Sequence, residues 1–390
     1  MKEKPQTMPP TAAKSKTPSA NREIPLARPF ITDAEIEAVV AVLRTPHLSL
    51  GPKVAEFEEG FAAVCDTKFA VACSSGTTGL HMLMGAVGVG PNDEVITTPF
   101  SFVASSNCIL MAGAKPVFVD IDPHTWNIRP ELIEATISPR TKAIIPVDVF
   151  GQPADIDAIN AVARRHRLRV IEDSCEALGS RYRGRPAGSL GDAGVFGFYP
   201  NKQITTGEGG MIVTDDPAIA ERCRSLRNQG RDTAGGWLAH PRLGYNYRLS
   251  DINCALGIVQ LKRLDEIVAV RGRMAEMYRE RLHGDPRLAL QQLSPDIEMS
   301  WFVFVVRLSD RYSAADRDRI LRELRSRGIA CSNYFAPIHL QPFYVDRFGF
   351  KPGDFPVCEA VAARTIALPF HHELTENDID RVCAELRSLL

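Results

Sequence analysis

The sequence predicts an α/β protein with a mainly parallel sheet, helices on both of its faces, and a smaller α+β domain at the C-terminal end. From about residue 93 to residue 216, short apolar runs alternate with helical stretches, which is typical of parallel strands joined by helices. Beyond about Asp251 this alternation stops. We therefore expect a large domain over residues 24–250 and a small domain over residues 251–390.

The first 23 residues are rich in Pro, Lys, Thr and Ser and contain almost nothing apolar to bury. Such a composition predicts a disordered tail. The first helix is expected in "TDAEIEAVVAVLRT", which begins with a capping box of Thr32 and Glu35 and continues with helical apolar spacing. A second helix is expected after "SSGTTG", because apolar residues recur at i, i+3, i+4 and i+7 from Leu80.

Six apolar runs predict strands of the large sheet. They are "DEVITTPFSF", "KPVFVDI", "KAIIPVDVF", "LRVIEDS", "GVFGFY" and "GMIVTDD". Ligands of such sheets lie at the carboxyl ends of the strands, so candidate site residues are sought there.

The C-terminal part has a different pattern. "INCALGIVQLKRLDEIVAVRGRMAEMYRERL" predicts one long helix, "SWFVFVVRLS" a strand, and two capped helices are expected to start near Ser313 and Thr375.

Composition excludes several classes of function. The 46 basic and 47 acidic residues leave a net charge of -1, which gives no electrostatic signature for binding nucleic acid or an anionic membrane. No run is long and apolar enough for a membrane span or a secretory signal. The nine cysteines are scattered singly, without the spacing of a metal site, and read as reduced core residues. We expect a cytoplasmic protein that binds no metal.

Four features at strand ends or helix starts could carry chemistry. "SSGTTG" could hold a phosphate at a helix N-terminus, although an ordinary capped turn explains it equally well. Asp173 could pair with a protonated ring nitrogen or simply cap a helix. Phe102 could stack on a flat ligand or belong to the core. Lys202, in "FYPNKQITTGEGG", could be a reactive amine or a solvated loop residue.

Rival cofactor motifs are absent from the sequence, which contains no GxGxxG between a strand and a helix, no GxxxxGK[ST] and no HExxH. Together, a phosphate cradle, a carboxylate for a ring nitrogen, a stacking aromatic and an amine are the parts needed to bind pyridoxal 5'-phosphate (PLP). In such sites lysine supplies the Schiff base, and the carboxylate keeps the pyridine protonated so that it accepts electrons.

The chain resembles the DegT/DnrJ/StrS family of sugar aminotransferases, which have the type I, aspartate aminotransferase fold of PLP-dependent transferases with a seven-stranded type of sheet. The similarity extends from "IPLARPFITDAEIEAV" to "HELTENDIDRVCAEL". Matching stretches between them include "LSLGPKVAEFE", "SSGTTGLHML", "VIEDSCEALGS", "FYPNKQITTGEGGMIVTDD", "LGYNYRLSDINCALGIVQL" and "APIHLQPFY".

The resemblance implies a role for each matching residue. Lys202 would be the Schiff-base lysine and the base that moves the proton, and Asp173 would pair with the pyridine nitrogen. Phe102 would stack on the ring, while Gly76 and Thr77 would bind the phosphate.

Two positions vary from the family pattern. Glu176 stands where relatives often have Gln or His near the ring hydroxyl, a variant found in perosamine-type members. Gly197 replaces a serine that often binds the phosphate, so Asn201 could supply the missing contact.

The resemblance also implies a homodimer with shared active sites. Asn246 in "GYNYR" matches an asparagine that reaches the cofactor phosphate of the neighbouring subunit, and Arg248 follows it as a candidate anion contact. His339 in "APIHLQP" matches a histidine close to the substrate.

The expected reaction is transfer of an amino group from L-glutamate to a nucleotide-linked 4-keto-6-deoxyhexose, because "TTGEGG" after the lysine is common among relatives that aminate the 4-position. Amination of a keto-cyclitol or of a 3-keto sugar is the alternative. A sugar dehydratase of this fold would carry histidine at position 202, and a non-catalytic regulator would be expected to have lost Lys202 or Asp173.

Overall fold

The computed structural model describes residues 22–232 and 239–390 of the 390-residue chain. Of the predicted disordered tail, all but Arg22 and Glu23 lie outside the described residues. Within the described part, the chain enters the fold at Ile24, which is buried and forms a parallel bridge with Ile329. No helix of the described residues is long and apolar enough to cross a membrane.

A seven-stranded sheet forms the centre of the molecule, in the order β1-β9-β8-β5-β4-β2-β3. Only β9 runs antiparallel to its neighbours, so the predicted mainly parallel sheet is confirmed. The strands are β1 (Phe69–Cys73), β2 (Glu94–Thr97), β3 (Lys115–Phe118), β4 (Thr141–Ile145), β5 (Arg169–Asp173), β8 (Ala193–Gly197) and β9 (Gly210–Thr214).

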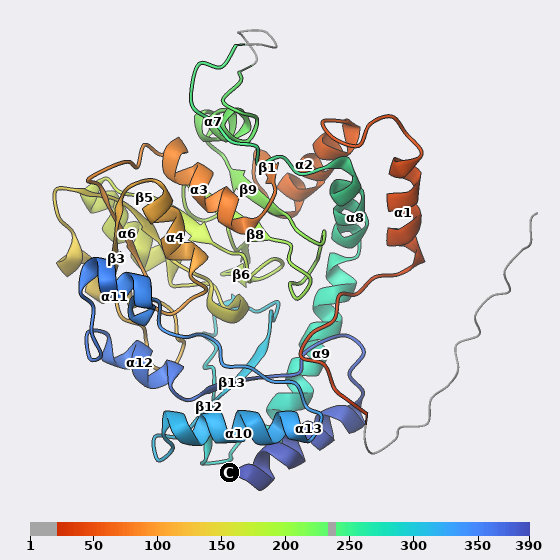
Figure 1. Cartoon of the computed structure of the whole chain (residues 1–390), viewed down its shortest axis with the longest axis vertical. Coiled ribbons are helices and arrows are strands. Elements are labelled where there is room, and N and C mark those ends of the chain that lie inside the picture. The colour runs from red at the N-terminus through yellow and green to blue at the C-terminus, as the bar shows by residue number, and fades with distance from the viewer. Residues whose placement is uncertain (1–21, 233–238) are drawn as a thin grey trace, which may run out of the picture.

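Helices cover both faces of this sheet (Figure 1). Alternate residues of β1 show the two faces, because Val71 packs with one set of helices and Ala72 with the other. On the first face lie α3 (Gly76–Ala86), α4 (Ala104–Met111) and α7 (Pro217–Arg227). On the second lie α2 (Pro52–Val64), α6 (Ile156–His166) and α8 (Asp251–Lys262). Helix α1 (Asp33–Leu43) packs against α8, and α5 (Pro130–Ile133), η1 (Glu134–Thr136) and η2 (Val149–Gly151) are short connections.

The C-terminal residues build a second, three-stranded antiparallel sheet with its own apolar core. Its strands are β10 (Leu288–Leu290), β12 (Phe304–Leu308) and β13 (Thr365–Leu368), and its helices are α9 (Leu264–Leu282), α10 (Ala314–Ser326) and α13 (Glu376–Leu389). The shorter η3 (Ile338–Leu340), α11 (Pro342–Phe348) and α12 (Pro356–Ala362) lie between α10 and β13 in the chain. The domain boundary at residues 250 and 251 stays a prediction.

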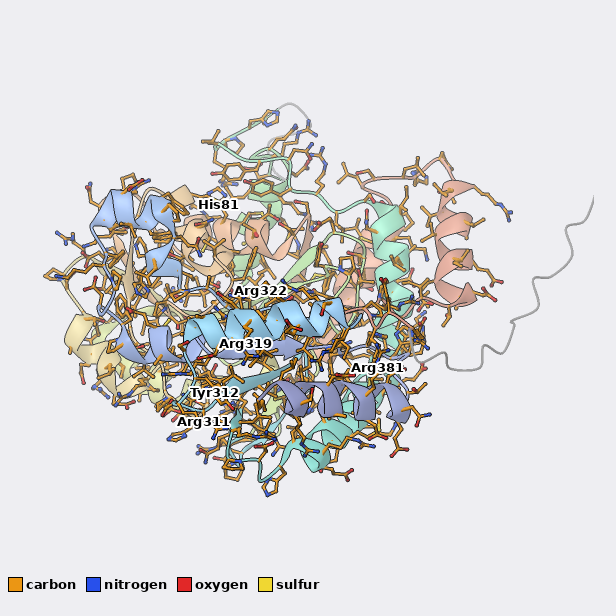
Figure 2. All side chains as sticks on the ribbon, turned by 60° about the horizontal axis from the view of Figure 1, so that its bottom comes forward. His81, Arg311, Tyr312, Arg319, Arg322 and Arg381 are labelled. Atoms are coloured by element: carbon orange, nitrogen blue, oxygen red, sulfur yellow. The ribbon has the colours of Figure 1, made fainter. Side chains whose placement is uncertain are left out.

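The predicted helix caps of this part are present. The side chains of Ser313 and Thr375 accept the N–H groups three residues ahead and start α10 and α13. Figure 2 shows these two helices side by side, with Arg319 and Arg322 on α10 and Arg381 on α13. Arg381 donates to the carbonyls of Arg22 and Arg327, both at 2.6 Å, and so ties the start of the described chain to the end of α10.

Two predicted elements differ from the structure. The single long helix is wrong, because it breaks into α8 and α9 at Arg263, whose N–H bonds to the carbonyl three residues back and closes a tighter turn. The strand predicted in "SWFVFVVRLS" starts only at Phe304, because Trp301 adopts a left-handed backbone conformation with φ 54° that an extended strand does not allow.

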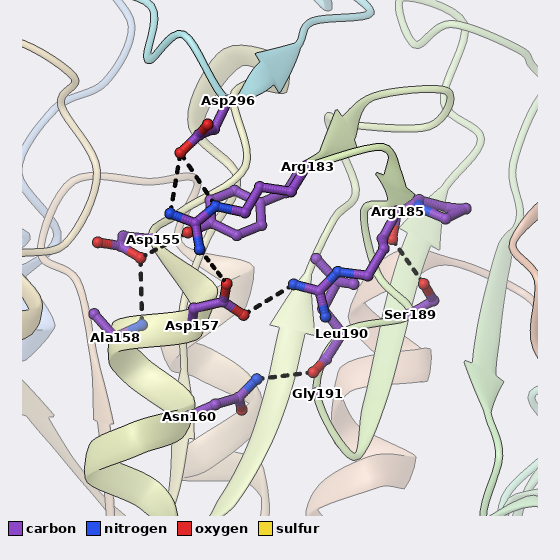
Figure 3. A network of polar contacts seen from close by, with 12 residues as sticks. Asp155, Asp157, Ala158, Asn160, Arg183, Arg185, Ser189, Leu190, Gly191 and Asp296 are labelled. Carbon is purple, nitrogen blue, oxygen red and sulfur yellow. Dashed lines mark hydrogen bonds and ion pairs between the residues drawn. The ribbon is translucent and has the colours of Figure 1, made fainter.

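A third small sheet joins β6 (Arg181–Tyr182), β7 (Arg185–Pro186) and β11 (Ile297–Glu298). Charged side chains fasten it to α6, as Figure 3 shows: Arg183 donates to Asp157 and Asp296, and Arg185 donates to Asp157. These pairs are largely exposed, so each contributes little stability by itself.

Candidate active site

A cavity of about 690 Å³ opens at the edge of the large sheet where β1, β2, β4, β5 and β8 end. Parallel strands bring their carboxyl ends to one edge, so residues far apart in sequence meet here. Seven of the residues singled out in the sequence line this cavity: Gly76, Thr77, Phe102, Asp173, Glu176, Asn201 and Lys202.

One end of the cavity is formed by the first turn of α3. Ser75 caps this helix, and its Oγ accepts the N–H of Thr78 at 3.1 Å. The N–H groups of Gly76 and Thr77 belong to the first turn and have no carbonyl within the helix to bind, so they suit an anion. A side chain at Gly76 would collide with Cys175, because its Cβ would lie 2.6 Å from Sγ. The turn is therefore capped, and its first residues line the cavity, while binding of a phosphate there stays a prediction.

Asp173 is the last residue of β5 and is buried. One carboxylate oxygen accepts the hydroxyl of Ser105 at 2.6 Å, and the other accepts the N–H of Cys175 at 3.3 Å. The chain continues into turns after Asp173, so this residue caps no helix. Two hydrogen bonds thus fix the orientation of a carboxylate that lines the cavity.

The amine of Lys202 lies inside the cavity, with its side chain only 15% exposed, so it is not a solvated loop residue. Its Nζ is 3.4 Å from Oε1 of Glu176 and 3.8 Å from the ring centroid of Phe302. The other oxygen of Glu176 accepts the N–H of Phe150 at 2.8 Å. Burial raises the pKa of Glu176, and the nearby Lys202 opposes this effect. The pair places a proton donor and a proton acceptor at the same wall.

An aromatic wall was not foreseen from the sequence. Phe302, Tyr334 and Phe335 line the cavity with Asn333, and the rings of Tyr334 and Phe335 are stacked at 5.1 Å. Nothing in their local sequence marks these residues, because they reach the site only through the packing of the C-terminal residues on the large sheet. Phe102 is 61% exposed, so it does not belong to the core.

Three residues carried over from the family do not line this cavity. Asn246 forms an antiparallel bridge with Asn228, whose side-chain oxygen accepts a hydrogen bond from Arg248 at 2.9 Å. His339 is fully buried, with Nε2 3.0 Å from a carboxylate oxygen of Glu359. Within one described chain, these residues are separate from Lys202.

No group of three or more potential metal ligands occurs among the described residues. All nine cysteines are free thiols, and every one except Cys175 is buried. Burial raises the pKa of the Cys175 thiol well above its usual value, although it lines the cavity. A thiol held in its neutral form is a poor nucleophile.

The model of the DegT/DnrJ/EryC1/StrS aminotransferase family matches residues 29–387. The chain belongs to this family. It is 42% identical over 373 residues to GDP-perosamine synthase of Caulobacter vibrioides, a match that covers 94% of this chain and 98% of the relative. It is 38% identical over 380 residues to the spore coat polysaccharide biosynthesis protein SpsC of Bacillus subtilis, with 95% and 98% covered. A Streptococcus pneumoniae protein solved in its PLP-form superposes with a TM-score of 0.90 at 30% identity, covering 94% of this chain and 98% of that chain.

The protein is therefore a PLP-dependent sugar aminotransferase with the fold of its structural neighbours. The residues of the cavity fit the cofactor by their chemistry. The first turn of α3 offers N–H donors to a phosphate, Asp173 offers a carboxylate to a protonated ring nitrogen, and Lys202 offers an amine to an aldehyde. The side-chain oxygen of Asn201 is buried and has no hydrogen-bond partner among the described residues, which leaves it available to a ligand.

Proposed function

We propose that this aminotransferase transfers the amino group of L-glutamate to a nucleoside-diphosphate 4-keto-6-deoxyhexose, releasing 2-oxoglutarate, for a surface polysaccharide or a glycosylated metabolite. The observation that carries the proposal is the 42% identity, over 94% of the chain, to GDP-perosamine synthase. That relative makes GDP the first nucleotide to test. Amination of a 3-keto sugar or a keto-cyclitol is the alternative.

In this proposal six residues of the cavity have stated tasks. Lys202 binds the cofactor and moves a proton at Nζ, and Asp173 holds the proton of the pyridine nitrogen. Gly76 and Thr77 bind the phosphate by their N–H groups, with Asn201 as a further contact, while Phe102 stacks on the ring. Bound in this way, PLP withdraws electrons from the substrate carbon that loses or gains the proton.

The substrate is tested with a panel of nucleotide-linked 4-keto and 3-keto sugars and scyllo-inosose, each with glutamate or glutamine as donor. Mass spectrometry should detect a 4-amino sugar and 2-oxoglutarate. Parallel lines in steady-state kinetics are expected, because the amino group leaves glutamate before the sugar binds. Turnover of 3-keto sugars or scyllo-inosose alone would show that the position of amination is wrong, although the protein would remain an aminotransferase.

The assignment of Lys202 is tested by borohydride reduction of the protein loaded with PLP. Reduction should fix the cofactor to the peptide that contains Lys202, since this amine lies in the cavity beside the first turn of α3. A stable adduct on another lysine, such as the exposed Lys351, would overturn the assignment.

The quaternary structure belongs to the same proposal: a homodimer in which Asn246 and Arg248 of one chain reach the cofactor phosphate of the other. Their absence from the cavity of a single chain is compatible with such sharing. Mixing inactive Lys202→Ala with inactive Asn246→Ala chains should restore part of the activity, because one hybrid site has both native residues. Verified heterodimers without activity would mean that Asn246 acts within its own chain.

We also propose a cytoplasmic location, which the nine free cysteines support, since disulfides are rare in reducing compartments. A role of His339 at the substrate would require its segment to move, because the ring is packed against Phe355 at 4.7 Å. His339→Ala should then raise the KM for the sugar, whereas an unchanged KM would leave this histidine a structural role.

A further inference from the structure

Arg271, on α9, is a buried cation whose side-chain hydrogen bonds in the described part of the chain all go to backbone carbonyls, and its guanidinium also lies 5.1 Å from the ring centroid of Phe370. It donates to the carbonyl of Trp301 at 2.7 Å, to that of Phe302 at 2.6 Å and, with a longer bond, to that of Asn201 at 3.4 Å. No carboxylate in the described part of the chain forms an ion pair with it. Burial lowers its pKa to about 10. Removing a charge from water without a counter-charge costs free energy, so we expect Arg271 to have a role at this position.

Two of the three carbonyls that Arg271 binds, those of Trp301 and Phe302, belong to a strained turn. Trp301 has φ 54°, a left-handed conformation that is unfavourable for a bulky residue. By holding the carbonyls of Trp301 and Phe302, Arg271 fixes this turn just before β12 begins. Fixing the turn also fixes the direction of the Phe302 ring, and the centroid of this ring lies 3.8 Å from Nζ of Lys202.

The same turn is also connected to Lys202 through hydrogen bonds by way of Phe150 and Glu176. The N–H of Phe302 bonds to the carbonyl of Phe150 at 3.1 Å, and Phe150 is itself left-handed, with φ 62°. The N–H of Phe150 in turn bonds to Glu176, whose other oxygen is 3.4 Å from Nζ of Lys202. Both neighbours of the amine, the ring and the carboxylate, are thus attached to one turn.

Arg271 also touches the lysine's own loop. Its third acceptor, the carbonyl of Asn201, belongs to the residue directly before Lys202. One guanidinium, whose planar shape allows several hydrogen bonds in fixed directions, therefore joins the loop of Lys202 to the turn of Phe302.

We propose that Arg271 and the Trp301–Phe302 turn position the amine of Lys202, holding Nζ against the ring of Phe302 and beside Glu176. The proposal rests on the proposed role of Lys202 in binding the cofactor. The ring face of Phe302 and the carboxylate of Glu176 hold the amine in one place before it reacts. Arg271 itself touches no reacting atom and is a positioning residue.

The test compares Arg271→Gln and Phe302→Leu with the matched control Arg279→Gln. Arg279 lies on the same helix with its guanidinium 6.0 Å from the ring of Trp301, and no hydrogen bond from it to the turn is found in the described part of the chain. The purified full-length chain, before loading with PLP, is treated with a limiting amount of acetic anhydride. Mass spectrometry then measures acetylation of Lys202 relative to the exposed Lys351.

Acetylation of Lys202 should become about tenfold faster in Arg271→Gln and Phe302→Leu, because the amine is no longer held against the ring of Phe302. It should stay at the wild-type rate in Arg279→Gln. After loading with PLP, both site variants should lose activity by up to about a hundredfold in kcat with little change in KM, as expected for a displaced reacting group.

An unchanged rate of Lys202 acetylation in folded Arg271→Gln and Phe302→Leu would overturn the proposal, even if Arg271→Gln lowers Tm. Arg271 and the Trp301–Phe302 turn would then have a structural role only. If Arg271→Gln does not fold, Phe302→Leu decides alone. Acetylation needs no cofactor, so the two proposals can fail separately. A borohydride adduct on another lysine overturns the role of Lys202 in catalysis but not its positioning.

Discussion

Two buried pairs of a carboxylate and a cation show how differently the chain uses the same chemistry. Glu35 and Arg263 join α1 to the junction of α8 and α9, at 2.7 Å. Glu176 and Lys202 lie side by side in one wall of the cavity, at 3.4 Å. Both carboxylates are nearly inaccessible to solvent.

The first pair is saturated with hydrogen bonds. Besides Arg263, Glu35 accepts the N–H of Thr32 at 2.7 Å and the amide of Gln260 at 2.8 Å. Burial raises the pKa of Glu35, but these hydrogen bonds outweigh it and lower the pKa to about 2. The charged form is therefore the one that the fold stabilises.

The second pair has fewer partners. Glu176 has one short hydrogen bond, from Phe150, and one long contact with Lys202. Burial then prevails, and the pKa of Glu176 is raised. The difference teaches that hydrogen bonds can outweigh burial and lower the pKa of a carboxylate, as at Glu35, whereas burial raises the pKa where few hydrogen bonds oppose it, as at Glu176.

The largest expected effect is on activity, in Lys202→Ala. Turnover should fall by about a thousandfold or more, because the amine that we propose binds the cofactor and moves the proton is lost. The Tm of the chain without cofactor should stay close to the wild-type value, since the amine of Lys202 makes only a long contact with Glu176 and a contact with the ring of Phe302. Calorimetry and a coupled glutamate assay check both statements, and a large fall in Tm would place Lys202 among the structural residues.

Glu35→Gln should lower the stability and leave the activity nearly unchanged, the opposite of Lys202→Ala. We expect the free energy of unfolding to drop by about 2–3 kcal/mol, because Arg263 and Thr32 lose their charged acceptor. Urea denaturation measures this loss, with Glu37→Gln, an exposed position on the same helix, as the control. Activity of the folded fraction should remain within about twofold of wild type. Equal effects of the two variants would remove Glu35 from the residues that hold the fold.

The lowered pKa of Glu35 predicts how the difference in unfolding free energy between wild type and Glu35→Gln depends on pH. The folded chain holds the proton less tightly than the unfolded chain, so the stabilising effect is present above pH 4.5 and is lost as the pH falls toward 2. The gap in unfolding free energy between wild type and Glu35→Gln should therefore shrink between pH 6 and pH 3. A gap that stays constant over this range would contradict the lowered pKa.

The smallest effect, and one of opposite sign, is expected for the stability of Glu176→Gln. Because the pKa of Glu176 is raised, the folded chain binds its proton more tightly, and stability is lost as the pH rises through this value. At pH 7.5 the amide, which needs no ionisation, should leave Tm unchanged or slightly higher. Thermal unfolding of the chain without cofactor measures this, and a clear fall in Tm would show that Glu176 stabilises the fold as Glu35 does.

The sequence predicted those features that depend on short stretches of chain. The capping boxes at Thr32 and Ser313 need only residues three positions apart, and both are present. The alternation of strands and helices implied that Asp173 and the lysine loop would meet at one edge of a sheet, because parallel strands end on the same side.

The tertiary structure decided what local pattern cannot encode. The helix expected after Asp251 breaks at Arg263, whose charged partner Glu35 comes from the other end of the chain. The neighbours of the Lys202 amine, Phe302 and Glu176, come from two separate segments, and Arg271 fixes one of them from a third. Apolar periodicity and capping record hydrogen bonds between near neighbours, whereas the partner of a buried charge is chosen only when distant segments pack together.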